Sequence, residues 1–252
     1  MDIHDRDPDT WRVRDPGAHA RTVRAMFARI SGVYDGMNRL LSLGLDGRWR
    51  AAAAARLDAD VGTVLDLCAG TGDLARACRA AGRGRAWVAA DFTPEMLHRG
   101  RRRSGAADLR WLAADGLRLP LRARCIDAVV VGFGVRNFAD VRAELHEMQR
   151  VLRPGGQLVV LEFFRDDPAA VGSMRGAPAL VRSLVARLVP IAGWLVGRDH
   201  AAYSYLPGST ARFLSPAEFV SLLAKCGYDD VHVARLTGGI AHVVSAHSRQ
   251  KM

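Results

Sequence analysis

Three acidic residues lie in or at the ends of segments whose apolar composition predicts buried strands. Asp66 lies in TVLDLC, Asp91 ends AWVAAD, and Asp115 ends LRWLAAD. The carboxyl ends of parallel strands share one edge of a sheet, and ligands bind at that edge. An acid there, as at Asp91, can accept hydrogen bonds from both hydroxyls of a ribose. The three residues therefore predict a site for a ligand that carries a ribose.

A glycine turn follows the first of these strands in VLDLCAGTGDLA, residues 64–75. Gly70 and Gly72 let the backbone approach a ligand closely, and the helix that opens at Gly72 offers unpaired N–H groups. The spacing D-x-x-x-G-x-G differs from the dinucleotide fingerprint G-x-G-x-x-G, and no Walker lysine is present. With the three acids, the turn resembles the S-adenosylmethionine (SAM) site of class I methyltransferases, in which Asp115 would reach the adenine amino group. The alternative is that each acid only caps the helix after its strand.

The stretch VVVGFGVRNFAD, residues 129–140, runs from a predicted strand into Arg136 and Asn137. Both side chains should lie beside the crevice at the strand ends. A guanidinium can stabilise a developing oxyanion, but it is too basic to serve as an ordinary general base. In the alternative interpretation, Arg136 pairs with a nearby acid and Asn137 caps the helix that starts near Asp140.

An alternation of strands and helices places these residues. It predicts an α/β fold with a mainly parallel sheet covered on both faces, closed by an antiparallel C-terminal hairpin. Seven strands in this arrangement resemble the Rossmann-like sheet of class I methyltransferases. The expected strands are 63–68, 86–91, 109–115, 126–133, 157–163, 231–237 and 240–248, and the expected helices among them are 72–81, 94–103, 139–152 and 215–228.

One domain accounts for the pattern. Residues 18–248 are expected to form it, with N-terminal helices in 18–56 and a helical insertion in 165–213, and residues 1–17 are expected to be flexible. The most apolar stretch of the insertion, residues 179–197, contains two arginines and a proline, so it is a poor membrane span. Three interpretations stay open for it: a helix lying on the inner face of the cell membrane, a homodimer interface, or a lid packed on the sheet.

The composition excludes several classes of protein. The chain has 252 residues, a net charge of +10, and four cysteines without a C-x-x-C pair. This argues against a disulfide framework or a zinc site, and the polar N-terminus lacks a signal segment, so we expect a cytoplasmic protein. No interleaved basic and aromatic stripe indicates nucleic-acid binding. Glu144, His146 and Glu147 lack a metal-ligand spacing and are expected to face solvent, so no metal site is predicted.

Longer motifs resemble those of the ubiquinone/menaquinone biosynthesis C-methyltransferases, the UbiE/MenG family. The similar segments are FARISGVYDGMNRLLSLGLDGRWR, FGVRNFAD, RVLRPGGQLVVLEF and AYSYLPGS. The resemblance implies transfer of a methyl group from SAM to a ring carbon of a polyprenylated quinol, with S-adenosylhomocysteine as product. The quinol would be demethylmenaquinol, a polyprenyl methoxybenzoquinol of ubiquinone biosynthesis, or both. Methylation of another lipid or aromatic metabolite is the alternative.

The resemblance also assigns roles. Cofactor contacts fall at Thr71, Asp91, Asp115 with Gly116, and Gly132, where the family is expected to have serine. They join Asp66, Gly70 and Gly72 of the glycine motif. In the proposed chemistry, Arg136 polarises a water that removes the quinol proton, Asn137 orients that water or the ring hydroxyl, and Tyr34 closes over the pocket. Packing is the alternative for Tyr34. Tyr203 and Tyr205 are candidates for contact with the ring, and a structural role is the alternative for both.

Overall fold

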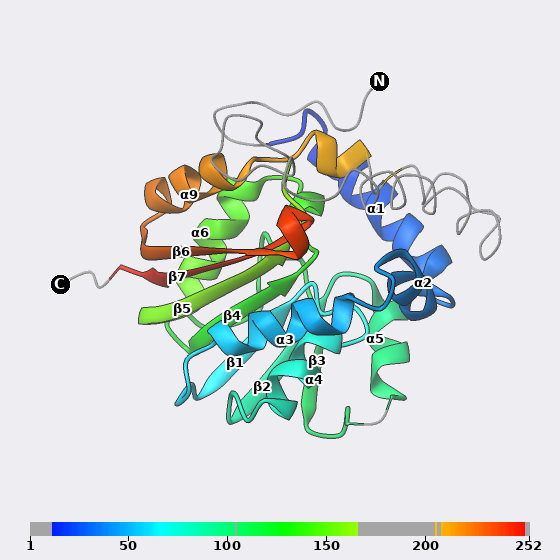
Figure 1. The fold of residues 1–252 in the computed structure, drawn as a ribbon, viewed down its shortest axis with the longest axis horizontal. Coiled ribbons are helices and arrows are strands. Elements are labelled where there is room, and N and C mark those ends of the chain that lie inside the picture. The colour runs from blue at the N-terminus through cyan, green and yellow to red at the C-terminus, as the bar shows by residue number, and fades with distance from the viewer. Residues whose placement is uncertain (1–11, 104, 166–204, 206–207, 250–252) are drawn as a thin grey trace.

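The fold is built on one seven-stranded sheet, in the order β3-β2-β1-β4-β5-β7-β6 (Figure 1). The computed structural model of the protein describes residues 12–103, 105–165, 205 and 208–249. β1 to β5 are parallel, and β7 pairs antiparallel with both β5 and β6. The predicted α/β class, with its C-terminal hairpin, is confirmed. The strands are β1 Thr63–Leu67, β2 Ala86–Asp91, β3 Leu109–Ala113, β4 Ile126–Gly132, β5 Leu152–Glu162, β6 Tyr228–Leu236 and β7 Ala241–Ser248.

Helices cover both faces of the sheet. Along β4, Ala128 and Val130 join the apolar cluster that contains α3 and α4, whereas Val129 and Val131 join the cluster that contains α6 and α9. Alternate side chains of a strand point to opposite faces, so the unbroken apolar run of β4 follows from burial on both sides. The helices are α1 Pro16–Ile30, α2 Tyr34–Leu41, α3 Asp46–Arg56, α4 Asp73–Ala80, α5 Pro94–Arg101, α6 Val141–Val151 and α9 Pro216–Lys225.

The ordered N-terminal part of the chain reaches further than the predicted start at residue 18. α1 begins at Pro16, and the side chain of Asp15 caps it by accepting from the N–H of Ala18 at 2.8 Å. Before this helix, the N–H of Val13 donates to the carbonyl of Ala139 at 2.9 Å. Residues 12–17 are therefore anchored to the segment that precedes α6, while residues 1–11 lie outside the described part of the chain.

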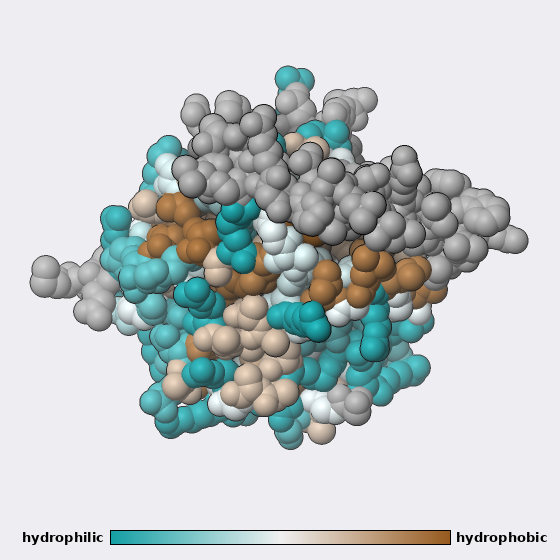
Figure 2. Space-filling model, in the orientation of Figure 1, coloured by the Kyte–Doolittle hydropathy of each residue, from teal (hydrophilic) through white to brown (hydrophobic). Residues whose placement is uncertain are grey.

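Most of the predicted insertion, including the apolar segment 179–197, lies outside the described residues. Among the residues that are described, no helix is long and apolar enough to cross a membrane. The visible face is mainly hydrophilic, with apolar side chains over α2 and β6 (Figure 2). Val33, Leu40 and Leu43, in and beside α2, are exposed.

Candidate functional site

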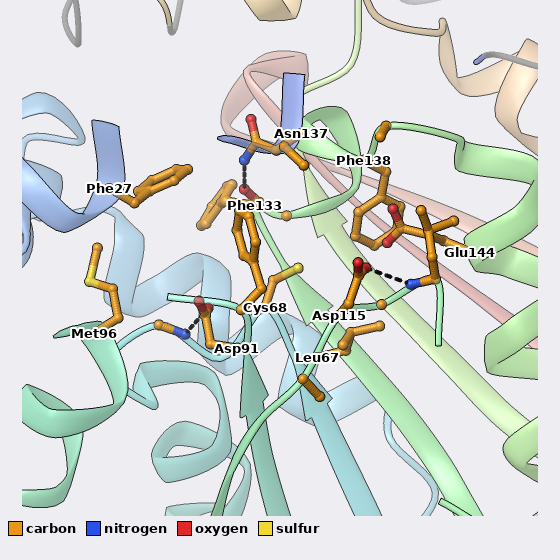
Figure 3. Close-up of a pocket in the computed structure, with 18 of the residues that line it drawn as sticks. Phe27, Leu67, Cys68, Asp91, Met96, Asp115, Phe133, Asn137, Phe138 and Glu144 are labelled. Atoms are coloured by element: carbon orange, nitrogen blue, oxygen red, sulfur yellow. Dashed lines mark hydrogen bonds between the residues drawn. The ribbon is translucent and has the colours of Figure 1, made fainter. Parts of the chain in front are cut away.

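A pocket opens at the carboxyl ends of β1, β2 and β4, under the N-terminal helices (Figure 3). Parallel sheets bind ligands at this edge because the loops after the strands are free to diverge there. A second, smaller hollow adjoins the pocket, and Tyr34, Cys68, Gly132 and Phe133 line both. Of the predicted site residues, the pocket is lined by Tyr34, Gly70, Asp91, Asp115, Gly116, Gly132 and Asn137, and the hollow by Tyr34, Asp66, Thr71 and Gly132.

The glycine turn between β1 and α4 has the left-handed backbone that its glycines predict. Gly70 has φ of 56° and Gly72 has φ of 81°. A β-carbon at Gly72 would lie 2.8 Å from the ring of Trp111, so a side chain is also excluded by space. Gly70 thus brings bare backbone to the pocket, as close approach of a ligand requires, whereas Gly72 lines neither hollow and packs against Trp111.

Asp91 holds the turn from the neighbouring strand. Its Oδ2 accepts from the N–H of Gly70 at 2.9 Å, and its Oδ1 accepts from the N–H of Thr93 at 2.8 Å. Burial raises the pKa of this carboxyl above its ordinary value, although the backbone donors oppose that rise. Asp91 does not cap α5, because the cap residue of that helix is Thr93. The capping alternative is therefore wrong for Asp91.

Asp115 lines the pocket in the loop that follows β3. Its Oδ1 accepts from the N–H of Leu117 at 2.9 Å in a local turn, so it caps no helix. Gly116 packs directly against the Glu144 carboxylate, which leaves no room for a β-carbon. Glu144 is buried and lines the pocket, so the expectation that it faces solvent is wrong. It shares the inward face of α6 with Val141 and Leu145.

Asp66 does cap a helix, but with one oxygen only. Its Oδ2 accepts at 3.0 Å from the N–H of Ala75, the third residue of α4. Its Oδ1 is buried without a hydrogen-bond partner among the described residues. Burial is the main cause that raises the pKa of Asp66 to about 7. A buried acceptor with no partner is costly, so this oxygen is suited to a ligand's donor.

Thr71 links the turn to α2. Its Oγ1 donates to Asp35 Oδ1 at 2.7 Å, and Arg103 contacts both Asp35 Oδ2 at 2.6 Å and Thr71 Oγ1 at 3.1 Å. Tyr34, the residue before Asp35, lines the pocket and meets the Phe27 ring edge-on at 5.9 Å. Burial raises the pKa of Tyr34, so its hydroxyl stays protonated at neutral pH.

Arg136 and Asn137 lie in a short 3-10 helix, Val135–Asn137, and point in different directions. The Arg136 guanidinium, 8% exposed, donates to Glu162 Oε1 at 2.5 Å and to the Phe133 carbonyl at 2.9 Å. Arg136 does not line the pocket, and its pairing with an acid, the alternative interpretation, is confirmed. Phe133 has φ of 57°, a strained value for a non-glycine residue, and these contacts hold it.

Asn137 faces the pocket (Figure 3). Its Oδ1 accepts from the Tyr205 hydroxyl at 3.0 Å, its Nδ2 lies 3.4 Å from the Phe133 carbonyl, and its backbone carbonyl meets His19 Nε2 at 2.9 Å. The suggestion that Asn137 caps α6 is wrong, because Asp140 caps that helix through the N–H of Ala143 at 2.9 Å.

A family model for ubiE/COQ5 methyltransferases matches residues 16–249, which is nearly all of the sequence. The chain belongs to the ubiE/COQ5 methyltransferase family. A demethylmenaquinone methyltransferase of Thermus thermophilus is 41% identical over 221 residues, which cover 86% of this chain and 97% of that protein. The C-methyltransferase UbiE of a Caulobacter species is 36% identical, over 90% of this chain and 92% of its own length. Family membership makes the protein a methyltransferase.

Solved structures at low identity support the fold of this ubiE/COQ5 family member. A SAM-dependent methyltransferase of Thermotoga maritima matches with a TM-score of 0.62 at 17% identity, over 89% of this chain and 99% of that one. The [4+2]-cyclase SpnF matches with a TM-score of 0.64 at 14% identity, over 91% and 96%. Because a cyclase shares the fold, chemistry has to be argued from the site.

The structure adds two residues to the site that were not singled out from the sequence, although both belong to the N-terminal family motif. Arg50 of α3 lines the hollow beside Asp66, and Phe27 of α1 lines the pocket. Arg50 is the basic residue that ends the N-terminal family motif, and this was the available signal. Among the described residues, no group of His, Cys, Asp and Glu could hold a metal ion.

Proposed function

We propose that the protein transfers a methyl group from SAM to a ring carbon of a polyprenylated quinol. The observation that carries the proposal is one shared pocket: Asn137, from the family's F-G-x-R-N motif, lines the same space as Asp91 and Asp115. A residue of the motif most specific to quinone methyltransferases thus lines the same pocket as the two acids at strand ends, which suit a nucleoside. The names of the relatives supply the substrate class.

The residues of the pocket fit SAM. Asp91 would accept from the ribose hydroxyls, and Asp115, with Gly116, would meet the adenine. The glycine turn with Thr71 and the backbone at Gly132 would lie beside the middle of the SAM molecule. The unpartnered Oδ1 of Asp66 supports this fit, because a buried acceptor favours a ligand that brings a donor. When bound, SAM supplies an electrophilic methyl group.

The protein's part of the chemistry is to position the ring and to remove a proton. Loss of a quinol hydroxyl proton raises electron density at the adjacent ring carbon, and holding that carbon close to the methyl group contributes several kcal/mol. Asn137 would orient the ring hydroxyl or a water that takes its proton. Tyr34 remains a hydrogen-bond donor rather than a base, because burial raises its pKa.

Arg136 acts through the loop in this proposal. Its guanidinium is already occupied by Glu162 and by the Phe133 carbonyl, and Asn137 Nδ2 approaches the same carbonyl. Arg136 is therefore a positioning residue, because it holds the loop that carries Asn137. Its guanidinium does not line the pocket, so its charge acts on the ring across that loop. This replaces the direct contact with a phenolate that the sequence predicted.

The test is methyl transfer from labelled SAM to reduced demethylmenaquinone and, in parallel, to a reduced demethylated ubiquinone precursor, with mass detection of the product. We expect ring methylation of at least one, and the active substrate names the pathway. If SAM binds and neither quinol is methylated, the quinol proposal fails. Another lipid or aromatic acceptor then becomes the better candidate, and Gly132, which lines both hollows in place of the expected serine, is where we would look first.

A further inference from the structure

The outer side of α2 exposes apolar side chains, which we call the α2 patch. Its members are Val33, Leu40 and Leu43, which are 37%, 45% and 50% exposed. Val33 and Leu40 are two helical turns apart in the sequence, so they share one side of the helix. Apolar side chains over α2 are visible in Figure 2. Met37 of the same helix is buried and Tyr34 lines the pocket, so α2 lies between the pocket and this exposed surface.

Leu43 occupies the α2 patch in an unfavourable backbone conformation. Its φ is 52°, in the left-handed region that glycine and asparagine adopt more readily than leucine does. A glycine or an asparagine would therefore suit both this backbone and contact with water better. Strained residues are found where function or the surroundings hold them, so the leucine points to an apolar environment outside the chain.

The acidic residues near the patch are compensated inside the protein. Asp35 and Asp46 are the only acids between residues 29 and 48 of the sequence. Asp35 Oδ2 accepts from Arg103 Nη1 at 2.6 Å, and Asp46 is paired with Arg50. Neither acid therefore contributes an unpaired negative charge to the surface around the patch.

Exposed arginines flank the same patch. Arg39 precedes Leu40 on α2 and is exposed. Arg99 of α5, also exposed, packs beside the residue before Val33, because its Nη2 lies 3.1 Å from where a β-carbon of Gly32 would stand. Arginine can lay its apolar stem along a hydrophobic surface while its charge meets a polar layer. The surface thus combines exposed apolar side chains with positive charge.

We propose that the α2 patch docks the protein on an anionic phospholipid bilayer. Leu40 and Leu43 enter the interface between headgroups and acyl chains, and Arg39 and Arg99 meet the lipid phosphates. Charge complementarity favours this partner, and a specific protein interface would need about 20–30 residues on each side. The purpose of docking beside the Tyr34 pocket rests on the proposed function, because a polyprenylated quinol is dissolved in the membrane.

Vesicle binding tests the proposal without SAM or quinol. We would sediment the full chain with vesicles of equal parts phosphatidylglycerol and phosphatidylcholine, and with vesicles of phosphatidylcholine alone. The test variant combines Leu40→Gln with Leu43→Asn, because asparagine accepts a left-handed backbone. Val233→Gln is its matched control, since Val233 is 40% exposed on the edge strand β6. Arg39→Gln is compared with Arg122→Gln, an exposed arginine in the loop before β4.

We expect the natural protein to bind the anionic vesicles, and the double variant to bind them at least about tenfold more weakly. Arg39→Gln should weaken binding about fivefold at low salt, and both control variants should bind like the natural protein. The proposal is overturned if the natural protein does not bind anionic vesicles or if the double variant binds them equally well. It is also overturned if sedimentation equilibrium shows a dimer that the double variant dissociates, because the patch then joins two copies of the chain.

Methylation of a short-tailed, water-soluble quinol separates this proposal from the proposed function. The double variant should methylate that quinol at the natural rate, because the patch does not line the pocket. With a long-tailed quinol in anionic vesicles, its rate should fall at least about tenfold. Equal rates for the two proteins in vesicles would contradict the docking role. If the natural protein methylates neither quinol, the proposed function fails, and vesicle binding still decides whether the α2 patch docks on a bilayer.

Discussion

The two ends of the pocket are held in different ways. At the nucleoside end, Asp91 and Asp115 accept backbone N–H groups from their own or the adjacent loop. At the other end, Asn137 is held by His19 and Tyr205, which come from distant parts of the chain. The first end can form as soon as the sheet does, whereas the second needs several separate elements in place. Substitutions at the nucleoside end should therefore lower affinity for the cofactor, whereas substitutions at the Asn137 end should lower turnover or stability.

The largest effect on stability should come from the ion pair between Arg136 and Glu162, which holds the loop that carries Asn137. Glu162→Ala leaves the Arg136 guanidinium buried without its carboxylate, and we expect the free energy of unfolding to fall by about 3–5 kcal/mol in urea denaturation. Adding Arg136→Met should recover part of this loss, because the buried charge is then removed together with its carboxylate. A single mutant within about 1 kcal/mol of the natural protein would show that the pair does not hold the loop.

Asn137→Ala should show that the two ends of the pocket serve different steps, catalysis and cofactor binding. We expect kcat with the quinol substrate to fall about 100-fold, the scale of a lost acid–base contribution, while affinity for S-adenosylhomocysteine stays within about twofold. His146→Ala, an exposed change on α6, serves as the control. If affinity for S-adenosylhomocysteine falls together with kcat, Asn137 belongs to the nucleoside end and the comparison collapses.

Asp91→Ala should instead lower affinity for the cofactor. Losing the buried acceptor also releases the N–H of Gly70, so affinity for S-adenosylhomocysteine should fall at least about tenfold in calorimetry. Asp108→Ala removes an exposed acid from the loop before β3 and should leave affinity unchanged. Unchanged affinity in Asp91→Ala would remove the ribose contact from the proposal.

The pH dependence of binding sharpens the picture at Asp66. Burial is the main cause that raises the pKa of Asp66 to about 7; Asp91 and Asp73 act in the same direction, and the Ala75 N–H and Arg50 oppose them. The carboxylate whose Oδ1 would accept a ligand's donor is thus present above pH 7 and is lost below it. Lowering the pH from 8 to 6 should weaken S-adenosylhomocysteine binding by up to about tenfold. Asp66→Asn should abolish the dependence, because the side chain then no longer titrates. A slope that survives in Asp66→Asn belongs to another group.

The smallest effect is expected at Gly132. A β-carbon there would lie 3.2 Å from Leu74 Cδ2, so the crowding of a serine offsets the contact that its hydroxyl adds. Gly132→Ser should change affinity for S-adenosylhomocysteine by no more than about threefold in calorimetry. A much larger gain would mean that the nucleoside end was incomplete without the hydroxyl.

The same difference explains what could be predicted from the sequence. Gly70 and Gly72 were predictable because the turn between one strand and the next helix sets their geometry, and Asp91 was predictable because it ends the next strand of the alternating pattern. The pairing of Arg136 with Glu162 requires β4 and β5 to lie side by side, and only the alternative interpretation allowed for it. Glu144 was misjudged because it was read as a charged helix residue, although it stands on the face of α6 that holds Val141 and Leu145. Arg50 ends the N-terminal family motif, but its place beside Asp66 depends on how α3 packs against the sheet.

The contacts among Asp35, Thr71 and Arg103 have a thermodynamic consequence. They join α2 to the glycine turn, so the stability of the helix and that of the turn are linked, and the linkage works in both directions. A molecule that stabilises the turn also lowers the population of the open form of α2, and a change that frays α2 weakens the binding of that molecule. Slower hydrogen exchange in the backbone of α2 would then report, from outside the pocket, how much of the protein is occupied.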